Sequence, residues 1–161
     1  MADVDMFLKI DGIKGESLDD KHKDTIQVLS YSLGVNNEGT GSFNQGSGAG
    51  RAVVHDITVT KFVDIASPNL FISSCSGKHL DKAWLYVRRA GGNNPQDYIE
   101  ITLTEVFISS FHHLSSGDKL PQENITLNFA KIEFQYKTQT AKGTLGAAVK
   151  TGYDVKANKF S

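Results

Sequence analysis

The chain has 161 residues with 17 basic and 18 acidic side chains, so its formal net charge is −1. That length suits one domain, and 39% of the residues are apolar, which is enough to build a core. A nearly neutral chain lacks the basic face that broad nucleic-acid binding needs, so no nucleic-acid partner is expected. One cysteine excludes an intrachain disulfide and any zinc site made of several cysteines.

The N-terminus carries no targeting signal of the usual kind. Residues 1–5 contain two acids and no basic region, and the next apolar run is broken by Lys9. We therefore expect no cleaved leader. No stretch approaches the ~18 apolar residues of a membrane helix, so no membrane insertion is expected.

Alternation of apolar and polar side chains dominates the chain, which is the pattern of half-buried β-strands. It is clearest at 51–62, where Val53, Ile57 and Val59 share one face, and at 83–89 and 98–107. The full set of predicted strands is 4–10, 25–33, 51–62, 83–89, 98–107, 124–137 and 150–155.

The longest predicted strand, 124–137, changes phase in its middle. Its apolar residues stand at odd positions up to Phe129 and at even positions from Ile132 onward. A one-residue bulge near Ala130 would produce this shift and bend the strand as a closing barrel requires. Two separate strands, or one strand that changes sheet, would produce it too.

One stretch, 67–76, reads as a clear helix. Ser67 suits the N-cap, Pro68 suits the first helical position, and Gly77 is a C-terminal stop. We therefore predict a single, mainly β domain over 1–161, an antiparallel β-barrel or two-sheet barrel with one short α-helix. The large side chains expected inside it are Leu85, Ile101, Leu127 and Phe134.

Residues 34–50 differ from the rest of the chain. They hold six of the fifteen glycines, several Ser and Asn residues, and a single acid, Glu38. We expect a long, Gly-rich extended loop, flexible when free and functional, as loops of this length usually are. Phe43 provides an apolar anchor that a pure spacer would not need.

The sequence offers no recognisable catalytic, metal or cofactor site. After the glycines of 46–50, Arg51 stands where a phosphate loop needs Lys followed by Ser or Thr. The adjacent His112 and His113 point to opposite faces of a strand, and all five histidines are expected at the surface or hydrogen-bonded. Cys75 lies near the end of the predicted helix, where a reactive thiolate is disfavoured, and we expect it buried. Neither an enzyme nor a cofactor is predicted.

Several motifs, taken in chain order, resemble the haemolysin-coregulated protein (Hcp) family, the tube protein of type VI secretion. Together they cover nearly the whole chain. The motifs are DMFLKI (5–10), GIKGES (12–17), VLSYSLG (28–34), SPNL (67–70), CSGKH (75–79), VRRAGG (87–92) and ENITLNFA (123–130).

This resemblance implies a non-enzymatic protein that forms a ring of six copies, and rings that stack into a hollow tube. It implies spike and sheath proteins as partners and small effector proteins carried and stabilised in the lumen. It also implies residence in the bacterial cytoplasm before firing and export afterwards by the machine itself, without a signal peptide.

Two sets of site residues follow from the resemblance. Ser30 and Ser32 form the polar end of one face of 25–33 and are expected to face the lumen; a barrel edge facing bulk solvent is the alternative. The loop 34–50 is expected to settle on a neighbouring subunit or ring. Its predicted contact residues are Asn37, Gly39, Gly41, Phe43, Asn44, Gly46 and Gly48.

The alternative function is a monomeric β-barrel carrier that binds a small ligand. Such a carrier needs an internal cavity. The large side chains expected to point inward indicate a packed interior instead.

Overall fold

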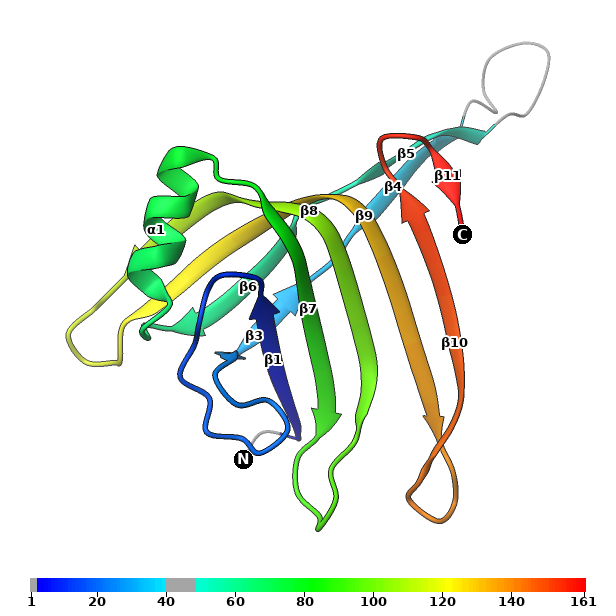
Figure 1. Ribbon diagram of the computed structural model, residues 1–161, viewed down its shortest axis with the longest axis horizontal. Helices are drawn as coiled ribbons and strands as arrows, with labels where there is room; N and C mark the ends of the chain where they lie inside the picture. The colour runs from blue at the N-terminus through cyan, green and yellow to red at the C-terminus, as the bar shows by residue number, and fades with distance from the viewer. Residues whose placement is uncertain (1–2, 40–48) are drawn as a thin grey trace.

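The computed structural model describes residues 3–39 and 49–161 of the chain. These residues form a mainly β domain with one helix, as predicted (Figure 1). The elements are β1 (Val4–Ile10), β2 (Ile26–Val28), β3 (Ser30–Ser32), β4 (Val35–Gly39), β5 (Ala49–Val54), β6 (Ile57–Phe62), α1 (Ser67–Ser76), β7 (Leu80–Arg89), β8 (Asp97–Leu114), β9 (Gln122–Gln139), β10 (Leu145–Asp154) and β11 (Lys159–Phe160).

The strand pairings in the described part of the chain are antiparallel. One sheet runs in the order β11-β10-β9-β8-β7-β1-β2, and β6 joins it by pairing with both β9 and β3. The single strand predicted over 25–33 is wrong, because the chain changes partner at Leu29. β2 pairs with β1, the Leu29 N–H donates to the Thr60 carbonyl at 2.8 Å, and β3 pairs with β6. At this one residue the chain therefore leaves its pairing with β1 and begins to pair with β6.

The core follows the predicted alternation. Ala83, Leu85 and Val87 of β7 are buried, and so are Ile101 and Leu103 of the neighbouring β8. Successive side chains of a strand point to opposite faces, so these residues fill the space between the curved sheet and the segments that cover it.

Phe134 is the exception among the side chains predicted to lie inside. Leu85, Ile101 and Leu127 are buried, whereas Phe134 is 37% exposed. It lies on the part of β9 that pairs with β10 rather than with β6. There it borders a surface groove instead of the core.

The phase shift within 124–137 is present, but the strand is continuous. Phe129 and Ala130 are both buried, although they are neighbours on β9. The β8–β9 register is the same on both sides of this point, and it shifts elsewhere, between Ile108 and Ser110 of β8. The shift instead coincides with a change of neighbour, since β9 pairs with β6 in its first part and with β10 in its second. The predicted bulge at Ala130 is thus not the cause.

The prediction of one strand over 51–62 is also wrong. The chain breaks at His55 and Asp56, and β5 leaves the main sheet to pair with β4. Val53 is consequently 55% exposed, whereas Ile57 and Val59 of β6 are buried.

The helix has the predicted bounds but a different start. Ala66 holds the N-cap position and Ser67 is the first helical residue, and the Ser67 hydroxyl donates to Glu123 instead of capping the helix. Gly77 ends the helix in the left-handed conformation, with φ +63°. Cys75 lies on the exposed face of α1, opposite Leu70 and Ser73, so its predicted burial is wrong. Among the described residues no helix has the length and apolar character to cross a bilayer.

Candidate functional site: surfaces for association

The first candidate surface is the arm, the β4–β5 hairpin, which extends away from the main sheet (Figure 1). The predicted loop over 34–50 is therefore wrong in part, because 35–39 and 49–50 belong to paired strands. A Cβ at Gly50 would overlap the Glu38 carbonyl, so the close approach of the two strands requires glycine there. Of the predicted contact residues, Asn37 and Gly39 lie on β4. Gly41, Phe43, Asn44, Gly46 and Gly48 lie outside the described residues.

The base of the arm forms one wall of an apolar groove. The other wall comes from β9, β10 and β11, and the groove has a volume of about 280 Å³. The Arg51 guanidinium donates to the Val155 carbonyl at 3.0 Å, which ties the arm to the turn after β10. The large apolar residues of the groove are Leu33, Val35, Val54, Ile132, Phe134, Tyr153 and Phe160.

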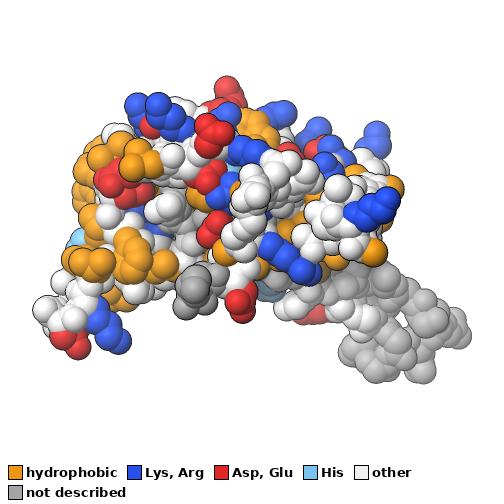
Figure 2. All heavy atoms as spheres, turned by 90° about the horizontal axis from the view of Figure 1, so that it is seen from below, with side chains coloured by type: hydrophobic (Ala, Val, Ile, Leu, Met, Phe, Trp, Pro, Cys, Tyr) orange, Lys and Arg blue, Asp and Glu red, His pale blue; other side chains and the backbone are white. Residues whose placement is uncertain are grey.

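A second apolar surface lies at the other end of the molecule. Figure 2 shows hydrophobic side chains gathered at the end that carries α1 in Figure 1. Exposed large side chains of this α1 patch come from the helix, the segment before it, the last residue of β8 and the β8–β9 connection. They are Ile65, Phe71, Ile72, Leu114 and Leu120.

Ser30 and Ser32 are exposed on β3, with half-buried Tyr31 between them. Burial raises the pKa of Tyr31, and the charge of Tyr98 adds to that effect. The two serines pair in register with Thr60 and Thr58 of β6, so a small polar strip forms on this side of the sheet. Whether that strip faces a lumen depends on assembly and stays a prediction.

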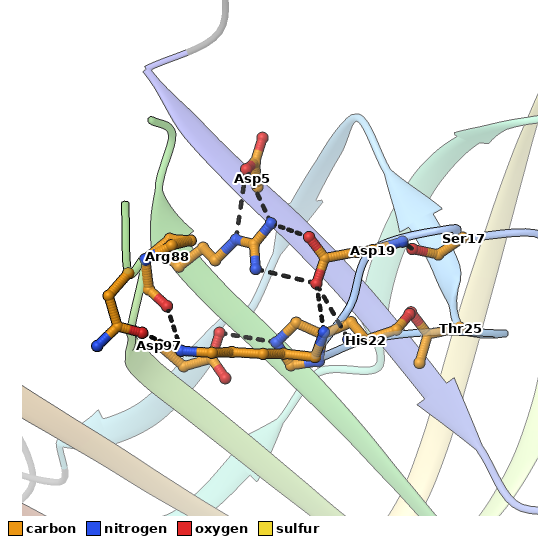
Figure 3. Close-up of polar contacts among 10 residues, drawn as sticks. Asp5, Ser17, Asp19, His22, Thr25, Arg88 and Asp97 are labelled. Carbon is orange, nitrogen blue, oxygen red and sulfur yellow. Dashed lines mark hydrogen bonds and ion pairs between the residues drawn. The ribbon is translucent and has the colours of Figure 1, made fainter. Parts of the chain in front are cut away.

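An arginine holds the β1–β2 connection, residues 11–25, against the main sheet (Figure 3). Arg88, near the end of β7, is buried and donates to Asp5 of β1 and to both carboxylate oxygens of Asp19. Its guanidinium also lies 4.9 Å from the centre of the Phe7 ring. The hydrogen bond from Arg88 lowers the pKa of Asp19, and the same bond raises the pKa of Arg88.

His22 anchors the same connection from below. Its ring stacks on Phe7 at 4.6 Å and lies 4.7 Å from the Tyr86 ring, between centroids. Its Nε2 is 2.9 Å from Asp97 Oδ1, and Thr25 donates to its backbone carbonyl at 2.7 Å. Burial, with the charges of Glu100 and Asp97, raises the pKa of Tyr86 to about 12. We call Arg88, His22 and their partners the latch.

A second charged cluster fixes α1 to the sheet. The Lys61 ammonium is fully buried and lies 2.7 Å from Glu123 Oε2 and 3.0 Å from Asp64 Oδ1. The Ser67 hydroxyl donates to the same Glu123 oxygen at 2.9 Å. Glu123 Oε1 has no hydrogen-bond partner among the described residues, and His113 Nδ1 lies 3.5 Å from it.

Neither the latch nor the Lys61 cluster was predicted. In the alternation of β7, Arg88 shares a face with Trp84 and Tyr86, opposite the buried Ala83, Leu85 and Val87. The β1–β2 connection covers that end of the face, and no periodic signal marks such a covering segment.

The histidine prediction is confirmed, since His22 is hydrogen-bonded and His55, His79, His112 and His113 are exposed.

The clusters do not assemble into a reaction centre. Among residues 3–39 and 49–161, no group of three or more His, Cys, Asp or Glu side chains could hold a metal ion. The Lys61 and Arg88 clusters pair acids with bases and join separate strands, which is a structural use of charge.

The chain is similar to known secretion proteins along almost its whole length. The protein-family model described as "Type VI secretion system effector, Hcp" matches residues 7–136. Protein hcp1 of Pseudomonas aeruginosa is 44% identical over 158 residues, which are 96% of this chain and 97% of that protein.

Solved structures agree with this relationship. One described as a type six secretion system protein superposes with a TM-score of 0.90 at 30% identity, covering 98% of this chain and 99% of its own. Hcp1 from Salmonella typhimurium superposes with a TM-score of 0.82 at 36% identity, covering 99% of this chain and 100% of its own. The chain therefore belongs to the Hcp family of type VI secretion, a family of structural secretion proteins rather than enzymes.

Proposed function

We propose that the chain assembles with copies of itself into a closed ring of six, and that the rings stack head to tail into a hollow tube. The tube is exported by the type VI machine, in contact with its sheath and spike proteins, and leaves the bacterial cytoplasm on firing. Small effector proteins travel in the lumen, where the polar strip with Ser30 and Ser32 provides a smooth wall.

The observation that carries this proposal is the presence of two different apolar surfaces at opposite ends of the folded molecule. The α1 patch is one of them, and the groove at the base of the arm is the other. A ring with head-to-tail contacts needs two different surfaces on each copy, and it closes when the rotation between copies closes. Monomeric proteins rarely expose large apolar patches without a partner.

An unpaired strand edge supports the same conclusion. β11 pairs only with Tyr153 and Asp154 of β10, so the first part of β10 has β9 on one side and no described strand on the other. That part carries Val149, which is largely exposed. Exposed edges invite pairing with another chain, and a closed assembly uses them up.

The alternative, a monomeric ligand carrier, has less support. Leu85, Ile101 and Leu127 fill the interior between the strands. The groove is open to the surface and is bounded by the arm, which suits a protein side chain better than an enclosed small molecule.

The first test is the oligomeric state. We expect native mass spectrometry of the full chain to give a mass six times that of one chain, and negative-stain micrographs to show rings with a central hole. Dilution should release single chains, since association depends on concentration. A mass of one chain at every protein concentration up to the millimolar range would contradict the proposal.

The second test concerns the arm. Replacing residues 39–48 with Asn-Gly retains the Val35–Val54, Asn36–Val53 and Asn37–Ala52 pairs and leaves a four-residue loop, Asn-Gly-Ala49-Gly50, between Glu38 and Arg51, a length that hairpins commonly use. We expect a melting temperature within a few degrees of the parent value, because β4 is exposed along its whole length. Rings should form while stacks shorten in micrographs. Stacks of unchanged length would remove the role assigned to the arm.

A further inference from the structure

Leu18 is displayed to solvent from a segment that cannot move freely. Its side chain is 90% exposed, the highest value among the large apolar residues in the described part of the chain. Its neighbours on both sides are fixed. Ser17 is buried and its N–H donates to the Thr25 carbonyl at 3.0 Å, while the carboxylate of Asp19 is held by Arg88.

A rigid apolar side chain in water is a suitable anchor for a partner. Because the loop is already ordered by the latch, binding through Leu18 loses little further conformational entropy. Anchors of this kind insert into pockets on the partner surface. The question is therefore which surface accepts Leu18.

The groove at the base of the arm has the matching shape and chemistry. Its volume of about 280 Å³ is ample for one leucine side chain, and Phe134, Tyr153 and Phe160 supply apolar contact area. Phe160 is itself 77% exposed, so water leaves apolar surface on both partners when the two meet.

The charges beside the two surfaces are also complementary. Glu16 and Asp20 flank Leu18 and are exposed, and the Glu16 carboxylate also accepts from the Ile65 N–H at 2.7 Å. Of the three lysines of this connection, Lys21 donates to Asn94 and Pro95 and Lys14 pairs with Asp24, while Lys23 is exposed. Arg51 and Lys159 are exposed beside the groove. Opposite charges around an apolar contact fix its orientation and disfavour wrong partners.

The two surfaces cannot meet within one chain. The β1–β2 connection lies beside β1 and β2, at one end of the sheet order, and the groove lies beside β10 and β11, at the other end (Figure 1). A contact between them must join two copies. Because each copy offers both partners, the contact repeats from copy to copy.

We propose that Leu18 of one copy inserts into the groove of the next copy, with Glu16 and Asp20 facing Arg51 and Lys159. The Glu16 carboxylate accepts from the N–H of Ile65 in the α1 patch, so the loop that carries Leu18 adjoins that patch and both face the groove of the next copy. This contact is a residue-level determinant of the self-assembly proposed above, and it rests on that proposal. It assigns the groove to a second copy of this chain rather than to a small molecule.

Cysteine cross-linking tests the contact directly. In a Cys75→Ser background, Leu18→Cys combined with Phe160→Cys should give disulfide-linked dimers and higher multimers on mild oxidation, because each link joins two different chains. The matched controls are each cysteine alone and Leu18→Cys with Lys142→Cys, whose second site lies in the exposed β9–β10 turn. The contact is supported if the Leu18→Cys/Phe160→Cys variant gives a ladder of multimers and none of the control variants does.

Substitution of Leu18 gives an independent readout. Leu18→Asp should weaken the association by about 10- to 100-fold in dissociation constant, as expected for losing one buried leucine. Leu18→Met should assemble like the parent chain. At a protein concentration where each variant has the mass of one chain, circular dichroism and melting should be unchanged in both, since the side chain touches little of its own chain.

The outcomes separate this inference from the proposed function. If the parent chain itself stays monomeric, self-assembly fails and the inference fails with it. If the parent assembles while Leu18→Asp assembles equally well and the cysteine pair gives no ladder, only the Leu18 contact is overturned. Saturable binding of a small apolar ligand in the groove of the assembled form would also overturn it.

Discussion

Glu123→Leu is expected to destabilise the folded chain by about 3 kcal/mol, the lower end of the usual cost of removing one partner from a buried ion pair, because Asp64 still faces Lys61 at 3.0 Å. The Lys61 ammonium has no contact with solvent and lies 2.7 Å from the Glu123 carboxylate. In the variant, only Asp64 and the Ser67 hydroxyl would face it. Lys61→Met should cost a similar amount, because it leaves the Glu123 carboxylate buried and unpaired.

The double variant Lys61→Met with Glu123→Leu is expected to lose less free energy of unfolding than either single variant. It replaces both fully buried charges with apolar groups and leaves only the Asp64 carboxylate, which is 12% exposed and keeps its hydrogen bond from the Ala66 N–H. The exposed pair of Lys150 and Glu133, 3.1 Å apart, provides the matched control, and the same exchanges there should each cost under about 1 kcal/mol.

Urea unfolding followed by circular dichroism measures these differences. The experiments need a protein concentration at which each variant has the mass of one chain, since association would add to the apparent stability. If substitutions at the buried Lys61–Glu123 pair and at the exposed Lys150–Glu133 pair lower the free energy of unfolding equally, the Lys61 cluster does not hold α1 to the sheet.

The Lys61 cluster also shows where sequence reasoning stops. The alternation in β6 and β9 predicts both strands, and their register places Lys61 opposite Glu123. A charged residue at an alternating position normally indicates a solvated face. Here α1 and the segment before it cover that face, and this covering is a tertiary effect that the strand period does not contain.

The same division holds for the fold as a whole. The period-two pattern found β1 with its correct bounds, and local end signals found α1, because both depend on neighbouring residues. The breaks at Leu29 and at His55 were missed, since they occur where the chain changes its partner strand. The sequence pattern on each side of these breaks stays apolar and alternating.

The association surfaces were predicted unevenly for the same reason. The composition of 34–50 predicts an extended arm, and its described residues, 35–39 and 49–50, belong to the β4–β5 arm. Leu18 stands alone in a polar segment, without any periodic signal, and only its exposure and the fixed backbone on both sides identify it. The groove combines residues from β4, β5, β9, β10 and β11, so only the folded chain brings it together.

Arg88→Met is expected to cost about 2–4 kcal/mol of unfolding free energy at neutral pH. It leaves the carboxylates of Asp5 and Asp19 without their guanidinium, and it frees the β1–β2 connection from the sheet. The neighbouring Arg89, which is exposed, provides the control, and Arg89→Met should change stability by less than about 0.5 kcal/mol.

The pH dependence of this loss has a definite sign. Arg88 lowers the pKa of Asp19 in the folded state, so the pair contributes stability above the unfolded pKa of that carboxyl. The contribution is lost as the pH falls through the lower, folded value. The difference between the parent chain and Arg88→Met should therefore be constant from pH 7 to about pH 5 and should shrink below pH 4.

Arg88→Met should also weaken self-assembly, although Arg88 lies within its own chain. Asp19 directly follows Leu18, and the Arg88–Asp19 pair is the side-chain contact nearest to Leu18 among those that hold this loop to the sheet. A loop that must be ordered on binding loses part of its contact energy to conformational entropy. Leu18→Asp should therefore reduce assembly and leave the melting temperature of the single chain unchanged, whereas Arg88→Met should reduce both. If Arg88→Met lowers the melting temperature but assembles with the parent affinity, the latch stabilises the fold without preparing Leu18 for its partner.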